Sequence, residues 1–321
     1  MRGVIGLLAA LVFASAPAAD AQDYPSRPAH IIVPYAAGGI ADIAARLVGQ
    51  KLADALGPSF IVENRTGGNG FVAVTATARA PADGYTLVVG TVSEFTINPA
   101  LFRKLPYDVE RDLAPVAMLS DTPLVLVANV DSPYHSVADV IAAAKAMPDT
   151  LGISSPGTGT FNHVTIAQLE LEAGIRLLHV PYRGGAPAGT AVAAGDIPLG
   201  LLAISSAVPF LQSGRMRVLA VTTAKRSGFN MEWKTLQEEG ISRIDASNWV
   251  GMFAPRETPG PVIDRLHGEI QKILATDHIR SVLALGGGEP TPMSLADFAA
   301  RIKADTVRFR SIVKEAGMQV E

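Results

Sequence analysis

Short apolar segments alternate with amphipathic segments along most of the chain. Each apolar segment is typical of a buried strand, and the glycine turn and helically spaced apolar positions that follow it are typical of a βα unit. The first unit has a strand at 29–34, a turn with Gly38 and Gly39, and a helix at 41–56. Further strands are expected at 60–63, 85–90, 123–128, 151–154, 177–180, 198–204 and 218–222, and further helices ending near 80 and at 137–147, 161–173, 261–275 and 295–316. Strands that alternate with helices predict an α/β fold in which each mainly parallel sheet is flanked by helices.

The chain length and the distribution of these units predict two lobes. A domain usually holds about 100–200 residues, and the 321 residues here contain one set of strand–helix units before about residue 122 and another after it. We expect lobe 1 to comprise 22–122 and 250–321, and lobe 2 to comprise 123–249. Extended crossings near 116–126 and 248–254 would join the lobes and let them hinge.

The N-terminal segment has the features of a secretory signal peptide. Arg2 supplies a positive charge, an apolar run covers 4–16, and Ala19-Asp20-Ala21 has the small residues of a cleavage site. The apolar run is shorter than the ~20 residues that span a bilayer, so we expect cleavage rather than a membrane anchor. Removal of the signal peptide at 1–21 would leave the mature chain in the periplasm.

Composition excludes several kinds of chemistry. The chain has no cysteine, which excludes disulfides, thiolate catalysis and cysteine-ligated metals. Its six histidines are scattered without the spacing of a zinc site, so no metal site is expected. The 27 basic and 30 acidic residues give a formal net charge of −3 without a long charge run, which argues against binding to nucleic acid.

Two glycine-rich turns, at 34–42 and 154–163, are the candidate binding elements. In open α/β sheets, ligands bind beyond the carboxyl ends of the strands, where helix N-termini favour anions and glycines let backbone N–H groups face the cleft. Either turn taken alone is equally consistent with an ordinary βα connection. Asp42 fits a role in the first turn of its helix better than a ligand contact. His163 fits a structural hydrogen bond better than catalysis, because the spacing yields no Ser–His–acid set.

Two motifs resemble cofactor-binding or catalytic signatures without completing them. The segment 68–73 (Gly-Asn-Gly-Phe-Val-Ala) fits the dinucleotide pattern, but the strand that follows lacks the expected acidic residue at its end. The segment 152–156 (Gly-Ile-Ser-Ser-Pro) departs from the nucleophile elbow, since Pro156 stands where a glycine is needed. We therefore expect no cofactor and no catalytic residues.

A series of short motifs runs in order through the chain. They are Tyr24-Pro-Ser-Arg-Pro28, Val33-Pro-Tyr35, Gly38-Gly39 with Asp42, Val62-Glu-Asn-Arg65, Ala80-Pro-Ala-Asp-Gly-Tyr-Thr-Leu87, Ile97-Asn-Pro-Ala-Leu101, Leu105-Pro-Tyr-Asp108, Val180-Pro-Tyr-Arg-Gly184 and Leu219-Ala-Val-Thr222. As a set, they resemble the Bug family of extracytoplasmic solute receptors, the substrate-binding components of tripartite tricarboxylate transporters.

The resemblance implies a two-lobed periplasmic-binding-protein architecture of the Venus flytrap, type II-like kind, which holds a small carboxylate between its lobes. In the family, backbone groups, hydroxyls and bridging waters of the βα loops contact the ligand. The residues at the matching positions are Tyr35, Ala36, Gly38, Gly39, Asp42, Thr91, Ser93, Thr158, Gly159, Thr160, His163 and Tyr182. The sequence departs from the family pattern at Ala36-Ala37, Pro198, Ala203 and 229–235, and these departures leave the identity of the ligand open.

The favoured function is that of a periplasmic solute-binding protein that captures a small organic acid, either a carboxylate or an amino acid. It would deliver this ligand to the permease subunits of a tripartite tricarboxylate-type transporter, and we expect it to act as a monomer. The alternatives are a ligand sensor without a dedicated permease and a periplasmic enzyme that uses the same cleft.

If Glu94 faces the cleft, we expect it to select between two classes of ligand. It follows Ser93 in the loop after the strand at 85–90, where the family more often has a small neutral residue. In the cleft, its carboxylate would repel a second acidic group on the ligand and attract an ammonium group, which would favour amino-acid-like ligands. The alternative is that Glu94 points to solvent, as most glutamates do.

Overall fold

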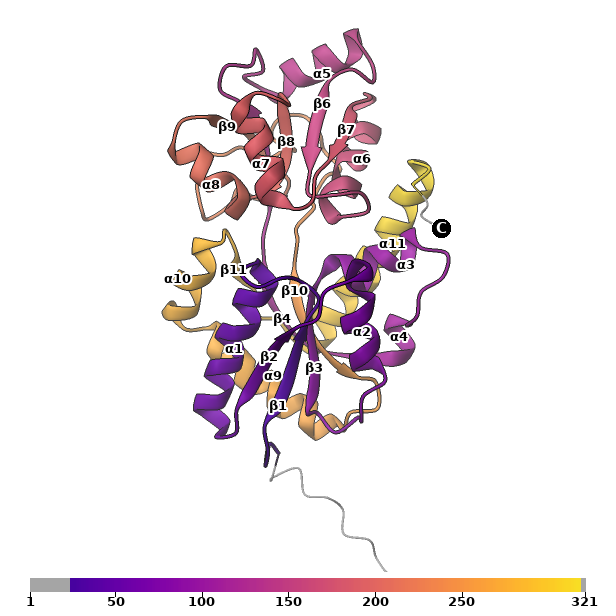
Figure 1. Ribbon diagram of the computed structural model, residues 1–321, viewed down its shortest axis with the longest axis vertical. Coiled ribbons are helices and arrows are strands. Elements are labelled where there is room, and N and C mark those ends of the chain that lie inside the picture. The colour runs from indigo at the N-terminus through magenta and orange to yellow at the C-terminus, as the bar shows by residue number, and fades with distance from the viewer. Residues whose placement is uncertain (1–23, 319–321) are drawn as a thin grey trace, which may run out of the picture.

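The computed structural model describes residues 24–318, so the predicted signal peptide at 1–21 lies outside the described residues. The described chain forms two bodies, one above the other in Figure 1, and each is built on its own sheet. We call the body with the six-stranded sheet lobe 1 and the body with the five-stranded sheet lobe 2. The predicted two-lobed α/β architecture is confirmed.

Lobe 1 carries helices on both faces of a sheet with the strand order β11-β4-β10-β3-β1-β2. Its strands are β1 (Ala29–Val33), β2 (Phe60–Asn64), β3 (Thr86–Thr91), β4 (Leu113–Asp121), β10 (Val250–Pro255) and β11 (Glu289–Pro290). Its helices and helical turns are α1 (Ile40–Leu56), η2 (Gly68–Gly70), α2 (Phe71–Ala78), η3 (Ser93–Ile97), α3 (Asn98–Leu101), α4 (Val109–Asp112), α9 (Gly260–Leu274), α10 (Asp277–Leu285) and α11 (Leu295–Glu315). Side chains alternate across β1: Ile31 and Val33 share a core cluster with residues of α1 and α9, whereas Ile32 joins residues of α2 and α11.

Lobe 2 also carries helices on both faces of its sheet, whose strand order is β7-β6-β8-β5-β9. Its strands are β5 (Leu124–Asn129), β6 (Gly152–Ser155), β7 (Leu178–Pro181), β8 (Leu199–Ala203) and β9 (Met216–Val221). Its helices are α5 (Val137–Ala146), α6 (Phe161–Ala173), α7 (Gly185–Ala194) and α8 (Ile204–Gln212). Val125 and Val127 of β5 face α7 and α8, and Leu124 and Leu126 belong to the cluster that includes residues of α5 and α6.

The sheets are mixed, which corrects the expectation that they are mainly parallel. The pairs β1–β2, β1–β3, β6–β7 and β6–β8 are parallel, whereas β10 runs antiparallel to both β3 and β4, and β5 runs antiparallel to both β8 and β9. A parallel pair needs a crossover connection that is usually a helix. The antiparallel strands β5 and β10 instead enter their sheets directly from the other lobe, so their direction is set by the interlobe crossing.

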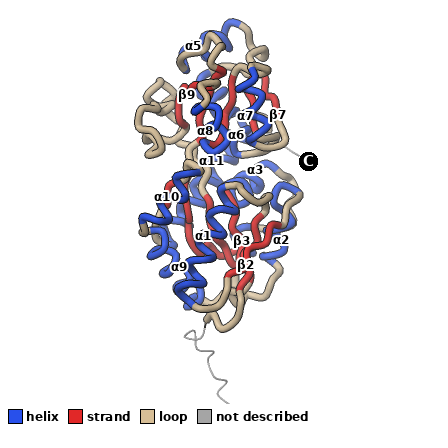
Figure 2. Tube along the Cα trace, turned by 60° about the vertical axis from the view of Figure 1, so that its left-hand side comes forward, coloured by secondary structure: helices blue, strands red, loops and turns tan. Residues whose placement is uncertain are grey.

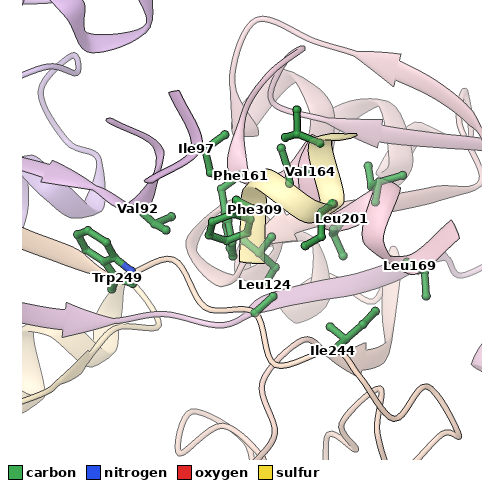
Figure 3. Packing of buried hydrophobic residues seen from close by; sticks show 14 of the residues in the cluster. Val92, Ile97, Leu124, Phe161, Val164, Leu169, Leu201, Ile244, Trp249 and Phe309 are labelled. Atoms are coloured by element: carbon green, nitrogen blue, oxygen red, sulfur yellow. The ribbon is translucent and has the colours of Figure 1, made fainter. Parts of the chain in front are cut away.

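Two crossing segments join the lobes, as Figure 1 and Figure 2 show, and the end of α11 lies beside lobe 2 (Figure 1). The crossings run side by side, because Asn248 N–H donates to the Thr122 carbonyl at 2.8 Å. The last turns of α11 extend to lobe 2, where the ring of Phe309 packs edge-on against Phe161 with their centroids 6.1 Å apart (Figure 3). The interlobe junction is therefore a packed core with a hydrogen-bonded pair of strands, not a loose linker.

A buried network of charges fastens α11 to the second crossing. The carboxylate of Asp305 accepts a hydrogen bond from Trp249 Nε1 at 2.8 Å and pairs with Arg301 and Arg308, each at 3.0 Å. Arg301 also donates to Ser247 Oγ at 2.9 Å. Because Trp249 is fully buried and Ser247 is in the same crossing, this network fixes the crossing against the helix.

Candidate functional site

A cavity of about 370 Å³ lies between the lobes, beyond the carboxyl ends of β1, β2 and β3. Lobe 1 contributes Pro34, Tyr35, Gly67, Gly68, Asn69, Gly70, Ser93, Glu94 and Asn98, and lobe 2 contributes Gly159 and Thr160. This is the place where open α/β sheets bind their ligands. A cavity of similar volume, about 400 Å³, is bounded by residues of lobe 1 alone, including those of the 102–111 segment and α11, so it does not join the two predicted turns.

The structure places the predicted residues at different depths around this cavity. Tyr35, Ser93, Gly159 and Thr160 line it. Ala36, Gly38, Gly39 and Thr158 are exposed, and Asp42 and Thr91 are buried. His163 and Tyr182 are half-buried in lobe 2 and do not line the cavity.

Asp42 shapes the first glycine turn. Its buried carboxylate accepts hydrogen bonds from the Gly38 N–H at 2.9 Å, Asn64 Nδ2 at 2.8 Å and Arg46 Nε at 3.0 Å. Burial alone would raise the pKa of Asp42, but the hydrogen bonds from Arg46, Gly38 and Asn64 hold this pKa below its usual value. Because both carboxylate oxygens of Asp42 accept these hydrogen bonds, Asp42 orders the first glycine turn.

Glu94 lies beneath the cavity, so the expectation that it points to solvent is wrong. Only 1% of the residue is exposed. Its carboxylate accepts hydrogen bonds from Tyr35 Oη at 2.5 Å, the Thr91 N–H at 2.8 Å and Thr91 Oγ1 at 3.1 Å. Burial raises the pKa of Glu94, and the hydrogen bonds oppose this rise. Since the single hydroxyl proton of Tyr35 is donated to Glu94, that hydroxyl is no longer a donor for a ligand.

The loop at 67–70 is part of the cavity wall and was not among the predicted site residues. Gly67, Gly68, Asn69 and Gly70 all have positive φ angles, of 126°, 53°, 49° and 87°. Asn98 Nδ2 donates to the Asn69 carbonyl at 2.9 Å and holds the loop in this conformation. The glycine cluster after β2 is the sequence signal for this wall, although as a motif it resembles only an incomplete dinucleotide signature.

The second glycine turn is ordered by residues at the start of α6. Thr160 caps this helix, and its hydroxyl donates to the Gly157 carbonyl at 2.8 Å. The Gly159 N–H donates to His163 Nδ1 at 3.1 Å, so His163 is the neutral tautomer with its proton on Nε2. Burial, and then electrostatic repulsion from His179, lower the pKa of His163 to about 4; the two rings are stacked with centroids 3.9 Å apart. His163 therefore has a structural role in this turn.

A serine–histidine pair occurs in lobe 2, although the spacing of the sequence did not indicate one. Ser155 Oγ lies 2.6 Å from His179 Nε2. Ser155 is fully buried, and Gly157 N–H also donates to its hydroxyl at 3.2 Å. Among residues 24–318, no carboxylate forms a hydrogen bond with His179. Without access for a substrate or an orienting acid, the pair stabilises the turn and lacks the arrangement of a catalytic triad.

No group of three or more His, Cys, Asp or Glu side chains converges within residues 24–318 in a way that could hold a metal ion. None of the helices in that same range is both long and apolar enough to cross a bilayer.

This chain is similar to a family of known proteins over most of its length. The profile described as "Tripartite tricarboxylate transporter family receptor" matches residues 44–318. The protein BugT of Bordetella pertussis is 31% identical over 322 residues, which cover 100% of this chain and 98% of BugT. A protein from the tcbD-tcbE intergenic region of Pseudomonas sp. strain P51 is 32% identical over 320 residues, which cover 98% of this chain and 94% of the relative.

Solved structures also resemble this chain over most of its length. An R. palustris protein with adipate superposes with a TM-score of 0.83 at 32% identity, covering 92% of this chain and 99% of the other. MatC from Rhodopseudomonas palustris with bound malate gives a TM-score of 0.79 at 29% identity, covering 90% and 100%. The periplasmic binding protein BugD gives 0.80 at 28% identity, covering 93% and 100%. The predicted resemblance to the Bug family is confirmed, and the chain belongs to the tripartite tricarboxylate transporter receptor family.

Proposed function

We propose that this protein captures a small organic acid in the interlobe cavity and delivers it, in the periplasm, to the permease subunits of a tripartite tricarboxylate-type transporter. The observation that carries this proposal is a cavity whose walls come from the βα turns of both lobes. A ligand in such a cavity contacts both lobes at once, so its binding free energy favours the closed arrangement. Adipate and malate in the related R. palustris structures support an organic acid as the ligand.

The anion would be held by neutral donors and helix termini. Among the described residues that line the cavity, none is an arginine or a lysine. The N-terminus of α6, capped by Thr160, lies at the cavity and favours an anion, as do hydroxyls such as that of Ser93. Each such interaction contributes roughly 0.5–3 kcal/mol, so several together give a useful affinity.

We also propose the domain boundaries and the oligomeric state. Lobe 1 would comprise 22–122 and 250–321, and lobe 2 would comprise 123–249, with closure about the two crossings. The protein would act as a monomer. The solved relatives include a periplasmic binding protein and a protein with bound malate, which favours binding over catalysis here.

A thermal-shift screen tests the proposed function. The panel holds monocarboxylates, dicarboxylates, tricarboxylates and amino acids. A ligand present at one hundred times its Kd should stabilise the folded protein by about 2.7 kcal/mol. Turnover of a panel compound, with no compound raising the unfolding temperature, would reject the binding function in favour of the enzyme alternative.

Substitution of Thr160 then locates the bound acid. Thr160→Glu should weaken a carboxylate ligand about ten-fold or more, because it places a like charge at the cavity wall. Thr160→Gln is the matched control, since it removes the same helix cap and adds similar volume without the charge. Arg183→Ala, at an exposed position of lobe 2, should change the affinity much less. Calorimetry that finds Arg183→Ala more damaging than Thr160→Glu would move the site elsewhere.

A further inference from the structure

We propose that Glu94 determines the ligand class, so that the preferred ligand carries an ammonium or similar cationic group at the Glu94 end of the cavity and a carboxylate at the Thr160 end. This inference rests on the proposed function and makes it more specific. Among the described residues that line the cavity, Glu94 is the sole residue with a carboxylate side chain. It would act as a specificity-determining residue in a family where relatives bind malate and adipate.

The hydrogen-bond partners of the Glu94 carboxylate are all neutral. They are the Tyr35 hydroxyl, the Thr91 N–H and the Thr91 hydroxyl. No ion pair of Glu94 with a Lys, Arg or His occurs among residues 24–318 at 4.0 Å or less. Two other buried carboxylates of lobe 1 do have cationic partners: Asp42 pairs with Arg46, and Asp305 pairs with Arg301.

A buried carboxylate without a cationic partner is costly, and the cost is relieved when a cation approaches or when the group takes up a proton. The raised pKa of Glu94 reflects the same burial. A ligand ammonium group in the cavity would supply the missing positive charge.

The residues around Glu94 keep its side chain in place. A Cβ atom at Gly70 would lie 2.6 Å from Glu94 Cγ, and one at Gly90 would lie 3.1 Å from Glu94 Oε2. A side chain at Gly70 would therefore force the Glu94 side chain to shift, and one at Gly90 would press on its carboxylate. The position of the carboxylate is therefore enforced from the loop at 67–70 and from β3.

The two ends of the cavity favour opposite charges on a ligand. Glu94 lies on the lobe 1 side of the cavity, whereas the N-terminus of α6 lies on the lobe 2 side and favours an anion. A zwitterion satisfies both ends at once. A dicarboxylate would instead place its second anionic group near Glu94, where water is partly excluded and like charges repel strongly.

Calorimetry on matched ligand pairs tests the inference. In each pair, one carboxylate is exchanged for an ammonium group on the same carbon skeleton: succinate with 3-aminopropanoate, adipate with 5-aminopentanoate, methylmalonate with alanine, and isobutylmalonate with leucine. The wild-type protein should bind the amino member of at least one pair about ten-fold or more tightly than its dicarboxylate partner. Glu94→Gln should abolish or reverse that preference. Glu63→Gln, at a paired carboxylate of β2 outside the cavity, should keep it.

The outcomes separate this inference from the proposed function. If the wild-type protein binds the dicarboxylates more tightly, the inference fails and the proposed function stands. A preference that persists in correctly folded Glu94→Gln protein also overturns the inference. If no member of any pair binds, the inference is rejected, and the thermal-shift panel decides separately whether the proposed organic-acid function stands. The wild-type comparison requires no substitution, so it decides the matter even if Glu94→Gln does not fold.

Discussion

Replacement of Asp305 by Asn would test the charge network that joins α11 to the second crossing. The Asp305 side chain is only 5% exposed and accepts hydrogen bonds from Trp249 Nε1 at 2.8 Å and Arg301 Nε at 3.0 Å. Arg308 Nη2 lies 3.0 Å from its other oxygen. Asn keeps the shape and one acceptor oxygen but removes the charge. Arg301 then retains Asp121, at 3.9 Å, as its remaining anion in the network.

The magnitude follows from how deeply these groups are buried. Breaking a buried ion pair by removing one partner costs about 3–5 kcal/mol, because an uncompensated charge remains. The side chains of Arg301 and Arg308 keep 30% and 27% exposure, so water screens part of their charge. We therefore expect Asp305→Asn to lower the free energy of unfolding by about 3 kcal/mol, at the lower end of that range.

Urea unfolding followed by circular dichroism measures this loss. Asp264→Asn makes the same substitution at an exposed position of α9, and it should change the free energy of unfolding by less than about 0.5 kcal/mol. If Asp305→Asn costs less than about 1 kcal/mol at an unchanged urea dependence, the network does not stabilise the junction and the reasoning is refuted.

Three other measurements address the turns and the hinge. Gly159→Ala should weaken ligand binding about five-fold or more in calorimetry, because Gly159 has a φ of 76° and a Cβ there would lie 2.9 Å from Leu101 Cδ2 of the other lobe. Leu101→Ala should restore only the part of the affinity that is lost to this contact, because the backbone strain remains. His163→Gln should flatten the pH dependence of the thermal midpoint. Burial lowers the pKa of His163 from 6.5 to about 4, so the unfolded state binds more protons in that window and wild-type stability falls as the pH drops through it. Ligand should alter the emission of the buried Trp249 and lower the radius of gyration, and identical scattering profiles at saturation would exclude closure.

Elements with regular apolar spacing could be predicted from the sequence, whereas elements defined by close packing could not. The helices α1, α9 and α11 lie within one residue of their expected ranges at each end. α7 was not expected, because its segment Gly185–Ala194 contains glycine and proline and has no large apolar stripe. Its contact with α8 requires small residues: a Cβ at Gly189 would lie 2.9 Å from the Ser206 carbonyl. That requirement becomes visible only when both helices are in place.

The candidate site divides in the same way. Tyr35, Ser93, Gly159 and Thr160 follow the carboxyl ends of strands, and that position in the chain is a local signal. The burial of Glu94 depends on space left by Gly70, which is 24 residues earlier and on another loop. No local pattern encodes that proximity, so the sequence left two alternatives for this side chain.

The contacts between the lobes limit how far the cavity can close. A Cβ at Gly159 would lie 2.9 Å from Leu101, and one at Gly287 would lie 2.5 Å from Ile204 Cβ in the opposite lobe. At a third point, the Gly228 N–H donates to Glu289 Oε1 at 2.7 Å, directly before the segment 229–235 that departs from the family pattern. In all three contacts a glycine of one lobe lies against a residue of the other. Steric contact with the main chain at these glycines therefore limits how closely the lobes can approach. The volume left for a ligand is then set mainly by backbone positions, and the choice among ligands of that size falls to the few polar side chains in the wall.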